Sequence, residues 1–149
     1  MYRKTLLVAI LGLMSCGLFA QASSEISMAG IIEDADAYIE LIENEYDNEI
    51  VRMEFDIIQD TKQSFRDLME GYEYGIIAFG DWRIKDIDIN VYEFVDDEWV
   101  LIESDDDVAE YAFVNISPEV TASYMIEITA YEFNEGYDVG HYGLLIFHP

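Results

Sequence analysis

The sequence predicts a mainly β protein: an antiparallel, jelly-roll-like β-sandwich of about eight strands with an N-terminal helix. Short runs of alternating apolar and polar residues recur at intervals of roughly 8–12 residues, and turn residues separate them. The chain is also 52% hydrophobic and 14% aromatic, so it can bury a core despite its high charge. Its 149 residues suit a single domain.

The N-terminus has the pattern of a secretory signal peptide. Arg3 and Lys4 form a basic start, an apolar stretch follows, and Ala20 and Ala22 provide the small residues of a cleavage site. The apolar stretch is shorter than the roughly 20 residues of a membrane-spanning helix. We therefore expect residues 1–22 to be removed and the protein to be exported, to the periplasm or the medium, without a membrane span.

The segment Leu13-Met14-Ser15-Cys16 offers an alternative, because it resembles a bacterial lipoprotein box in which Cys16 would be lipidated. The apolar stretch continues beyond this cysteine, which favours cleavage after Ala22. Cys16 is the only cysteine. The exported chain would then contain neither a disulfide nor a thiol nucleophile.

The charge of the chain narrows its possible partners. Removing residues 1–22 takes away two of the seven basic residues and none of the 32 acidic ones, so the exported chain would carry a net charge of about −27. Such a surface repels nucleic acids, which proteins bind through cationic side chains, and it disfavours anionic lipids. Divalent cations, an extracellular polymer or a basic protein are the partners that fit.

The segment 23–48 is predicted to be helical, with the helix running from Ser27 to about Asn44. Its apolar residues recur at spacings of three and four, and acids occupy the opposite face. The apolar residues are Ile32, Ala35, Ile39 and Ile42.

The next segment can be interpreted in two ways. Val51, Met53, Phe55 and Ile57 alternate with charged or polar residues, which favours a strand, although the helical spacing also continues to this point. We prefer the strand, because four successive alternations and β-branched residues support it.

Seven further extended segments complete the sandwich predicted for residues 49–149. They are residues 63–69, 72–79, 86–94, 99–103, 109–116, 121–132 and 141–147. The apolar residues change parity at Tyr92, which predicts a β-bulge there. Tyr124 follows a turn at Pro118, and we expect its hydroxyl to tie down that corner.

The stretch 63–147 resembles the bacterial pre-peptidase C-terminal (PPC-like) family of secreted β-sandwich domains, in its stand-alone form with an N-terminal helix. The resemblance rests on the order and spacing of short motifs. These are Gly71-x-x-Tyr74, Gly80-Asp81, Asp86-Ile87-Asp88-Ile89-x-x-Tyr92, Ser104-Asp105-Asp106-Asp107, Ile116-Ser117-Pro118, Tyr124-Met125-Ile126-Glu127-Ile128 and His141-Tyr142-Gly143-Leu144. The resemblance implies an exported β-sandwich domain that is usually attached to a hydrolase and is not itself catalytic. The cysteines of some relatives are absent, so their disulfides do not carry over.

A calcium site is the sharpest candidate for a specific function. Calcium binds six to eight oxygen ligands, and a sandwich could gather several acidic loops at one end. The candidate ligands are Asp81, Asp86, Asp88, Asp105, Asp106 and Asp107. The alternative is that these acids are a solvated surface, as expected for a chain with 32 of them.

The two tryptophans are predicted to have different roles. Trp82 lies in a predicted turn beside Arg83, where an indole can stack on a sugar or hold a cation. The alternative is that Trp82 folds back as a plug over the end of the sandwich. Trp99 begins a predicted strand, and we expect it in the core.

These observations favour a non-catalytic exported binding or structural module, with calcium as the candidate stabiliser. The two histidines have no cysteine beside them for a usual zinc site, and no Gly-x-Ser-x-Gly elbow is present. A small secreted hydrolase with paired carboxylates and an acidic partner or inhibitor of a basic protein remain as alternatives.

Overall fold

The computed structural model describes residues 27–149, of which Ile31–Pro149 form one compact unit. The predicted signal peptide and Cys16 lie outside the described residues. The elements, in order, are α2 (Ala29–Ile39), the π-helical turn η1 (Glu40–Glu45), β1 (Glu49–Ile58), β2 (Thr61–Leu68), β3 (Tyr74–Gly80), β4 (Ile84–Val95), β5 (Glu98–Asp105), β6 (Tyr111–Ile116), β7 (Ala122–Phe133) and β8 (Gly140–His148). Within residues 27–149, no helix is long and apolar enough to span a membrane.

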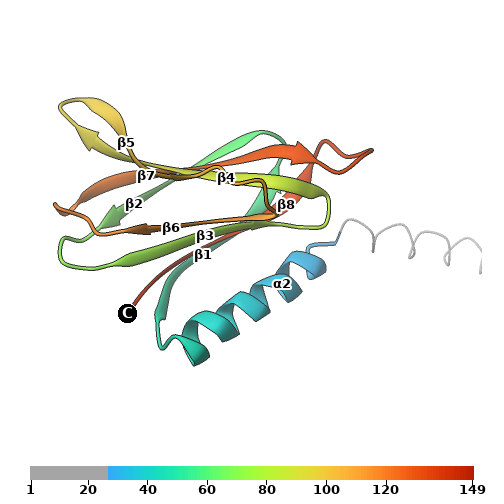
Figure 1. The fold of residues 1–149 in the computed structure, drawn as a ribbon, viewed down its shortest axis with the longest axis horizontal. Helices are drawn as coiled ribbons and strands as arrows, with labels where there is room; N and C mark the ends of the chain where they lie inside the picture. The colour runs from blue at the N-terminus through green and yellow to red at the C-terminus, as the bar shows by residue number, and fades with distance from the viewer. Residues whose placement is uncertain (1–26) are drawn as a thin grey trace, which may run out of the picture. The chain divides into compact units, whose positions relative to one another are not determined.

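The eight strands form two antiparallel four-stranded sheets, as the sequence predicts (Figure 1). Sheet A has the order β1-β8-β3-β6, and sheet B has the order β2-β7-β4-β5. Strands that follow each other in sequence therefore often lie in opposite sheets, which is typical of a sandwich. The segment whose interpretation was ambiguous is a strand, β1, and it pairs with β8.

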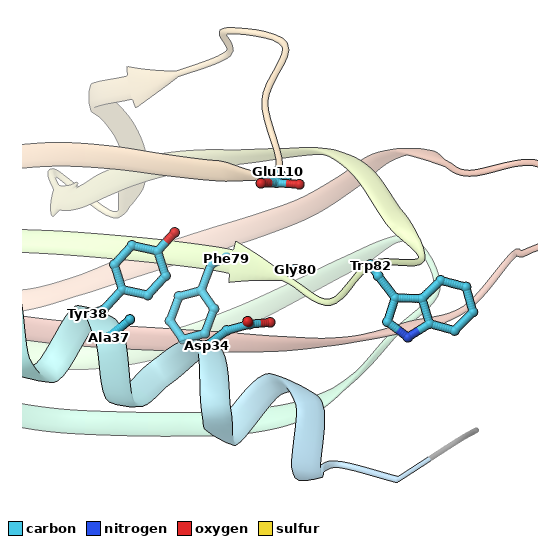
Figure 2. A pocket seen from close by; sticks show the side chains of 7 residues that line it. All are labelled: Asp34, Ala37, Tyr38, Phe79, Gly80, Trp82 and Glu110. Carbon is cyan, nitrogen blue, oxygen red and sulfur yellow. The ribbon is translucent and has the colours of Figure 1, made fainter. Parts of the chain in front are cut away.

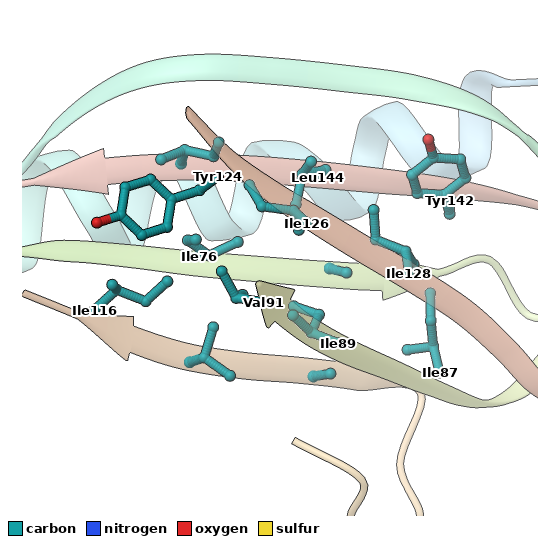
Figure 3. Close-up of a cluster of buried hydrophobic side chains, with 14 of the residues drawn as sticks. Ile76, Ile87, Ile89, Val91, Ile116, Tyr124, Ile126, Ile128, Tyr142 and Leu144 are labelled. Atoms are coloured by element: carbon teal, nitrogen blue, oxygen red, sulfur yellow. The ribbon is translucent and has the colours of Figure 1, made fainter. Parts of the chain in front are cut away.

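The main core lies between the two sheets and consists of side chains from alternate strand positions (Figure 3). Ile87, Ile89 and Val91 of β4 face Ile76 and Leu144 of sheet A, and all five side chains are fully buried. Alternation with period two thus places one face of each strand inward.

A second cluster explains why β3 and β8 are apolar without alternation. Helix α2 and η1 cover the outer face of sheet A, so both faces of these two strands are buried. The cluster consists of Ile31, Ala35, Ile42, Ile77, Phe79 and Leu145. The predicted apolar face of the helix is wrong at one position: Ile31 is buried, while Ile32 is 48% exposed.

Two local predictions are confirmed. The register between β4 and β5 shifts between Val91 and Tyr92, where the change of parity predicted a bulge. The Tyr124 hydroxyl donates a hydrogen bond to the carbonyl of Val120 at 3.1 Å, so it does tie down the corner before β7.

Candidate functional site

A groove lies between the α2–η1 segment and β6, the edge strand of sheet A that the helix leaves uncovered. Two hollows of about 340 and 510 Å³ make up this groove, and Tyr38 lines both. Helix, sheet and a turn contribute to it, so residues from 34 to 147 are brought together only by the fold. Seven of the sixteen lining residues are aromatic, and two carboxylates and two amides are among the others.

The smaller hollow places two carboxylates next to aromatic rings (Figure 2). Asp34 comes from α2 and Glu110 from the residue before β6, and both line the hollow with Trp82. Tyr38 packs on Phe79 with ring centroids 4.6 Å apart. Burial raises the pKa of Tyr38, and the charges of Glu110, Tyr111 and Asp34 add to this effect. Tyr38 therefore keeps its proton as a hydrogen-bond donor at neutral pH.

The larger hollow is more apolar and presents flat ring surfaces. Tyr46 is 67% exposed at one end, and Tyr111 and Phe113 of β6 are also exposed. The Phe113 and Phe147 rings are parallel within 9°, with centroids 6.2 Å apart. Asn48 and Asn115 add side-chain amides to the same lining. The groove thus combines stacking surfaces with groups that form hydrogen bonds.

A buried ion pair fixes the turn that presents Trp82. Asp81 and Arg83 are both buried, and the Arg83 guanidinium donates to both carboxylate oxygens at 2.5–3.1 Å. The Asp81 carboxylate also accepts the backbone N–H groups of Arg83 (3.0 Å) and His141 (2.9 Å). Burial opposes ionisation of Asp81, but these hydrogen bonds outweigh it and lower its pKa. The Asp81 carboxylate is therefore committed to internal partners.

His141 joins this network. Its Nδ1 lies 2.9 Å from an Arg83 terminal nitrogen and 3.2 Å from an Asp81 carboxylate oxygen. The sequence places Asp81 and Arg83 two residues apart, but His141 is 58 residues beyond Arg83. Only the adjacency of β3 and β8 in sheet A brings them together.

The Trp82 side chain itself points outward. It is 57% exposed and contacts Tyr137 edge-on, with ring centroids 4.8 Å apart. Asn134 donates to the Trp82 carbonyl at 2.8 Å and so ties the turn to the loop after β7. The interpretation of Trp82 as a plug is therefore wrong, and its indole is available to a ligand.

The expectation for Trp99 is also wrong. It lies on the outer face of sheet B, is 37% exposed, and packs on Phe94 and Phe65 with centroids 4.9 and 5.7 Å away. The physical reason is that β5 is an edge strand whose side chains stay exposed on both faces.

The other predicted calcium ligands gather only in part. Asp86 is buried and accepts the Ala109 N–H at 3.2 Å. Asp105 accepts the N–H groups of Asp107 (3.1 Å) and Phe113 (2.8 Å). These hydrogen bonds hold the loop between β5 and β6, so both carboxylates have structural roles.

Asp88 lies on the outer face of β4, close enough to neighbouring acids for their charges to affect its pKa. Burial raises the pKa of Asp88, and Asp86, Asp106 and Asp105 raise it further. Among residues 27–149, no group of three or more carboxylates, histidines or cysteines is arranged to hold a metal ion. Calcium binding stays a prediction.

Comparison with known proteins supports the fold alone. No family model matches the sequence, and no curated protein matches it. The pre-peptidase C-terminal domain of a collagenase from Bacillus anthracis is similar, with a TM-score of 0.51 at 10% identity over 64% of this chain and 87% of that one. Two weaker similarities are to PliG, a periplasmic inhibitor of g-type lysozyme from Aeromonas hydrophila (0.45, 12% identity, 68% and 86% covered), and to the Yersinia pseudotuberculosis-derived mitogen (0.46, 14%, 66% and 84%). The chain therefore shares a β-sandwich fold with a pre-peptidase C-terminal domain.

Proposed function

We propose that this protein is a non-catalytic exported module that binds neutral or amino-sugar units of an extracellular polysaccharide in the groove beside α2. The observation that carries this proposal is the exposure of Trp82, Tyr46, Tyr111 and Phe113 along one groove. Export is proposed from the signal sequence.

The chemistry of the lining favours a sugar. Aromatic faces bury the C–H surface of a pyranose ring, while a few polar groups among them orient the ligand. Asp34 and Glu110 can accept hydrogen bonds from hydroxyl groups, and Asn48 and Asn115 can donate as well as accept. A polysaccharide rich in carboxylate or sulfate groups would be repelled, because the chain carries a net charge of −25.

A catalytic role for paired carboxylates has less support. Such hydrolases use an acid whose pKa is raised so that it stays protonated. Burial raises the pKa of Asp88, but this residue lies on the outer face of sheet B, whereas the groove lies on the outer face of sheet A. The geometry therefore favours binding without turnover.

Titration with oligosaccharides tests the proposal. We expect cello-oligosaccharides or chitosan oligosaccharides to quench tryptophan fluorescence and to bind in calorimetry. Trp82→Ala should weaken binding about tenfold or more, if a sugar ring gains from stacking an amount similar to the roughly 1–3 kcal/mol that a nucleic-acid base gains on an aromatic side chain. Tyr131→Ala is the matched control, because Tyr131 is a 73% exposed aromatic residue on β7 of the other sheet.

Two results would count against the proposal. Equal weakening by both variants, or no binding of either oligosaccharide class, would remove the groove as a sugar site. Release of new reducing ends during the titration would favour the hydrolase instead.

A further inference from the structure

Strand β5 exposes an unusual apolar surface at the free edge of sheet B. Its central residues are Trp99, Val100, Leu101 and Ile102, which are between 37% and 50% exposed. A strand in a sandwich normally buries every second side chain, but here both faces of the strand are open. Its outer edge also lacks a neighbouring strand, since β5 ends the order β2-β7-β4-β5.

The opposite edge of sheet B is protected against strand addition, and β5 differs from it. Lys62 and Arg66 of β2 pair with positions of β7 whose side chains face the core, so β2 carries inward-pointing charges. Such charges are a device that prevents another strand from adding to an edge. The four central residues of β5 include no charge and no proline.

The β4–β5 hairpin is held in a conformation that can accept another strand. Asp96 and Asp97 at its tip have φ values of 51° and 68°, as a two-residue type I′ turn requires. Strand β5 pairs with β4 over residues 98–101 and 103–105, on either side of the register shift at Val91 and Tyr92, and Trp99 is packed on two aromatic rings. The Phe113 N–H fixes the far end through Asp105.

The charges around this edge identify the kind of segment that fits it. Acids flank the apolar centre on both sides, at 96–98 and at 103 and 105–107, and no lysine or arginine occurs from Asp86 to Pro149. A second copy of the chain, paired antiparallel through β5, would bring the acids at one end of each strand next to those of the other. A segment with basic residues at both ends would meet opposite charge instead.

We propose that β5 binds an extended segment of a basic protein by β-strand addition. The backbone of the segment pairs with the free edge, its apolar centre contacts Trp99 to Ile102, and its lysine or arginine residues meet the flanking acids. This site is separate from the groove beside α2, so the two proposals can fail independently.

A synthetic peptide tests the proposal on the whole exported chain. The probe is a labelled ten-residue peptide with alternating valine and threonine in the centre and two lysines at each end. We expect fluorescence anisotropy to show binding that weakens about tenfold when the lysines are replaced by serines or when salt rises to 0.5 M. N-methylation of alternate backbone amides should abolish binding, since it removes the donors of the added strand. Amide hydrogen exchange should slow at residues 99–102.

Two variants locate the site. Val100→Lys should weaken peptide binding about tenfold, because it places a positive charge on the free edge. Val108→Lys is the matched control: Val108 is 75% exposed and lies outside the strands, so this variant should bind the peptide almost unchanged.

Other outcomes would overturn the proposal. Equal binding of the serine and lysine peptides would contradict the role of charge, and binding of the N-methylated peptide would contradict strand addition. A dimer in sedimentation that Val100→Lys abolishes would show that the edge serves a second copy. Loss of peptide binding in Trp82→Ala would place the peptide in the groove.

Discussion

The buried ion pair between Asp81 and Arg83 provides the most direct test of the structure. Replacing Asp81 by Ala would leave the Arg83 guanidinium in a buried site, with its side chain only 8% exposed. The backbone N–H groups of Arg83 and His141 would lose their acceptor as well. Removing one partner of a buried ion pair usually costs about 3–5 kcal/mol, and unfolding free energies are about 5–15 kcal/mol. We therefore expect a loss of roughly a fifth of the unfolding free energy or more.

Urea unfolding followed by tryptophan fluorescence measures this loss. The control is Lys85→Ala, which removes a salt bridge to Glu132 of similar length, 2.7 Å, whose two side chains are about half exposed. Exposed pairs contribute about 0–1 kcal/mol. If Asp81→Ala cost no more than Lys85→Ala, the placement of the ion pair in the interior would be refuted.

The pH dependence of the same variant has a defined sign. The pKa of Asp81 is lowered in the folded state, because its hydrogen bonds outweigh the effect of burial. Its stabilising contribution is therefore complete above the unfolded pKa of about 4 and is lost as the pH falls through the folded pKa. The stability difference between the wild type and Asp81→Ala should accordingly shrink in acid. A difference that grows in acid would contradict the ion pair.

Three further predictions concern other parts of the sandwich. Asp88→Asn should raise the melting temperature at pH 7. Burial, and then neighbouring acids, raise the pKa of Asp88 in the folded state, so its charged form costs stability above that pKa. The gain should vanish below about pH 4, the pKa of an Asp in the unfolded chain, because the carboxyl is then protonated in both states. Tyr124→Phe should cost about 0.5–1.5 kcal/mol in urea unfolding, as one hydrogen bond to Val120 is lost, and no loss would exclude that bond. Calcium and magnesium at matched ionic strength should raise the melting temperature equally, because Asp81 and Asp105 already accept internal N–H donors; a saturable rise with calcium alone would instead demonstrate a specific site.

The strands could be predicted because their signal is local. Alternation over a few residues identified β1 and the bulge at Tyr92, and both depend on near neighbours in the chain. The orientation of the helix was harder, since Ile31 and Ile32 are both isoleucines and only packing against sheet A selects the first. Trp99 was misplaced for a related reason: an apolar run does not reveal whether its strand lies inside a sheet or at its edge.

The candidate sites could not be predicted as units, because each combines distant parts of the chain. Tyr38 and Tyr111 line one groove although 73 positions separate them in the sequence. The internal partners of Asp81 could not be predicted, because the presence of a carboxylate in the sequence does not reveal which donors it meets. In a chain with 32 acids, only the fold separates those that hold the structure from those that face solvent.

The distribution of charge should affect binding at the two proposed sites differently. All five basic residues in the described part of the chain lie between Arg52 and Lys85. The edge strands β5 and β6 lie near both sites and contact each other. Every charged side chain of these two strands and of the loop between them is acidic. The resulting field should attract a basic segment to β5 before contact is made, so its association rate should fall steeply with salt. A neutral sugar gains nothing from this field, so the binding of a cello-oligosaccharide should persist at high salt, whereas the amino groups of a chitosan oligosaccharide would lose the same attraction as the basic segment. Because salt weakens peptide binding and spares that of a neutral sugar, titrations of the basic peptide and of a cello-oligosaccharide in 0.5 M sodium chloride distinguish the sites without any mutation.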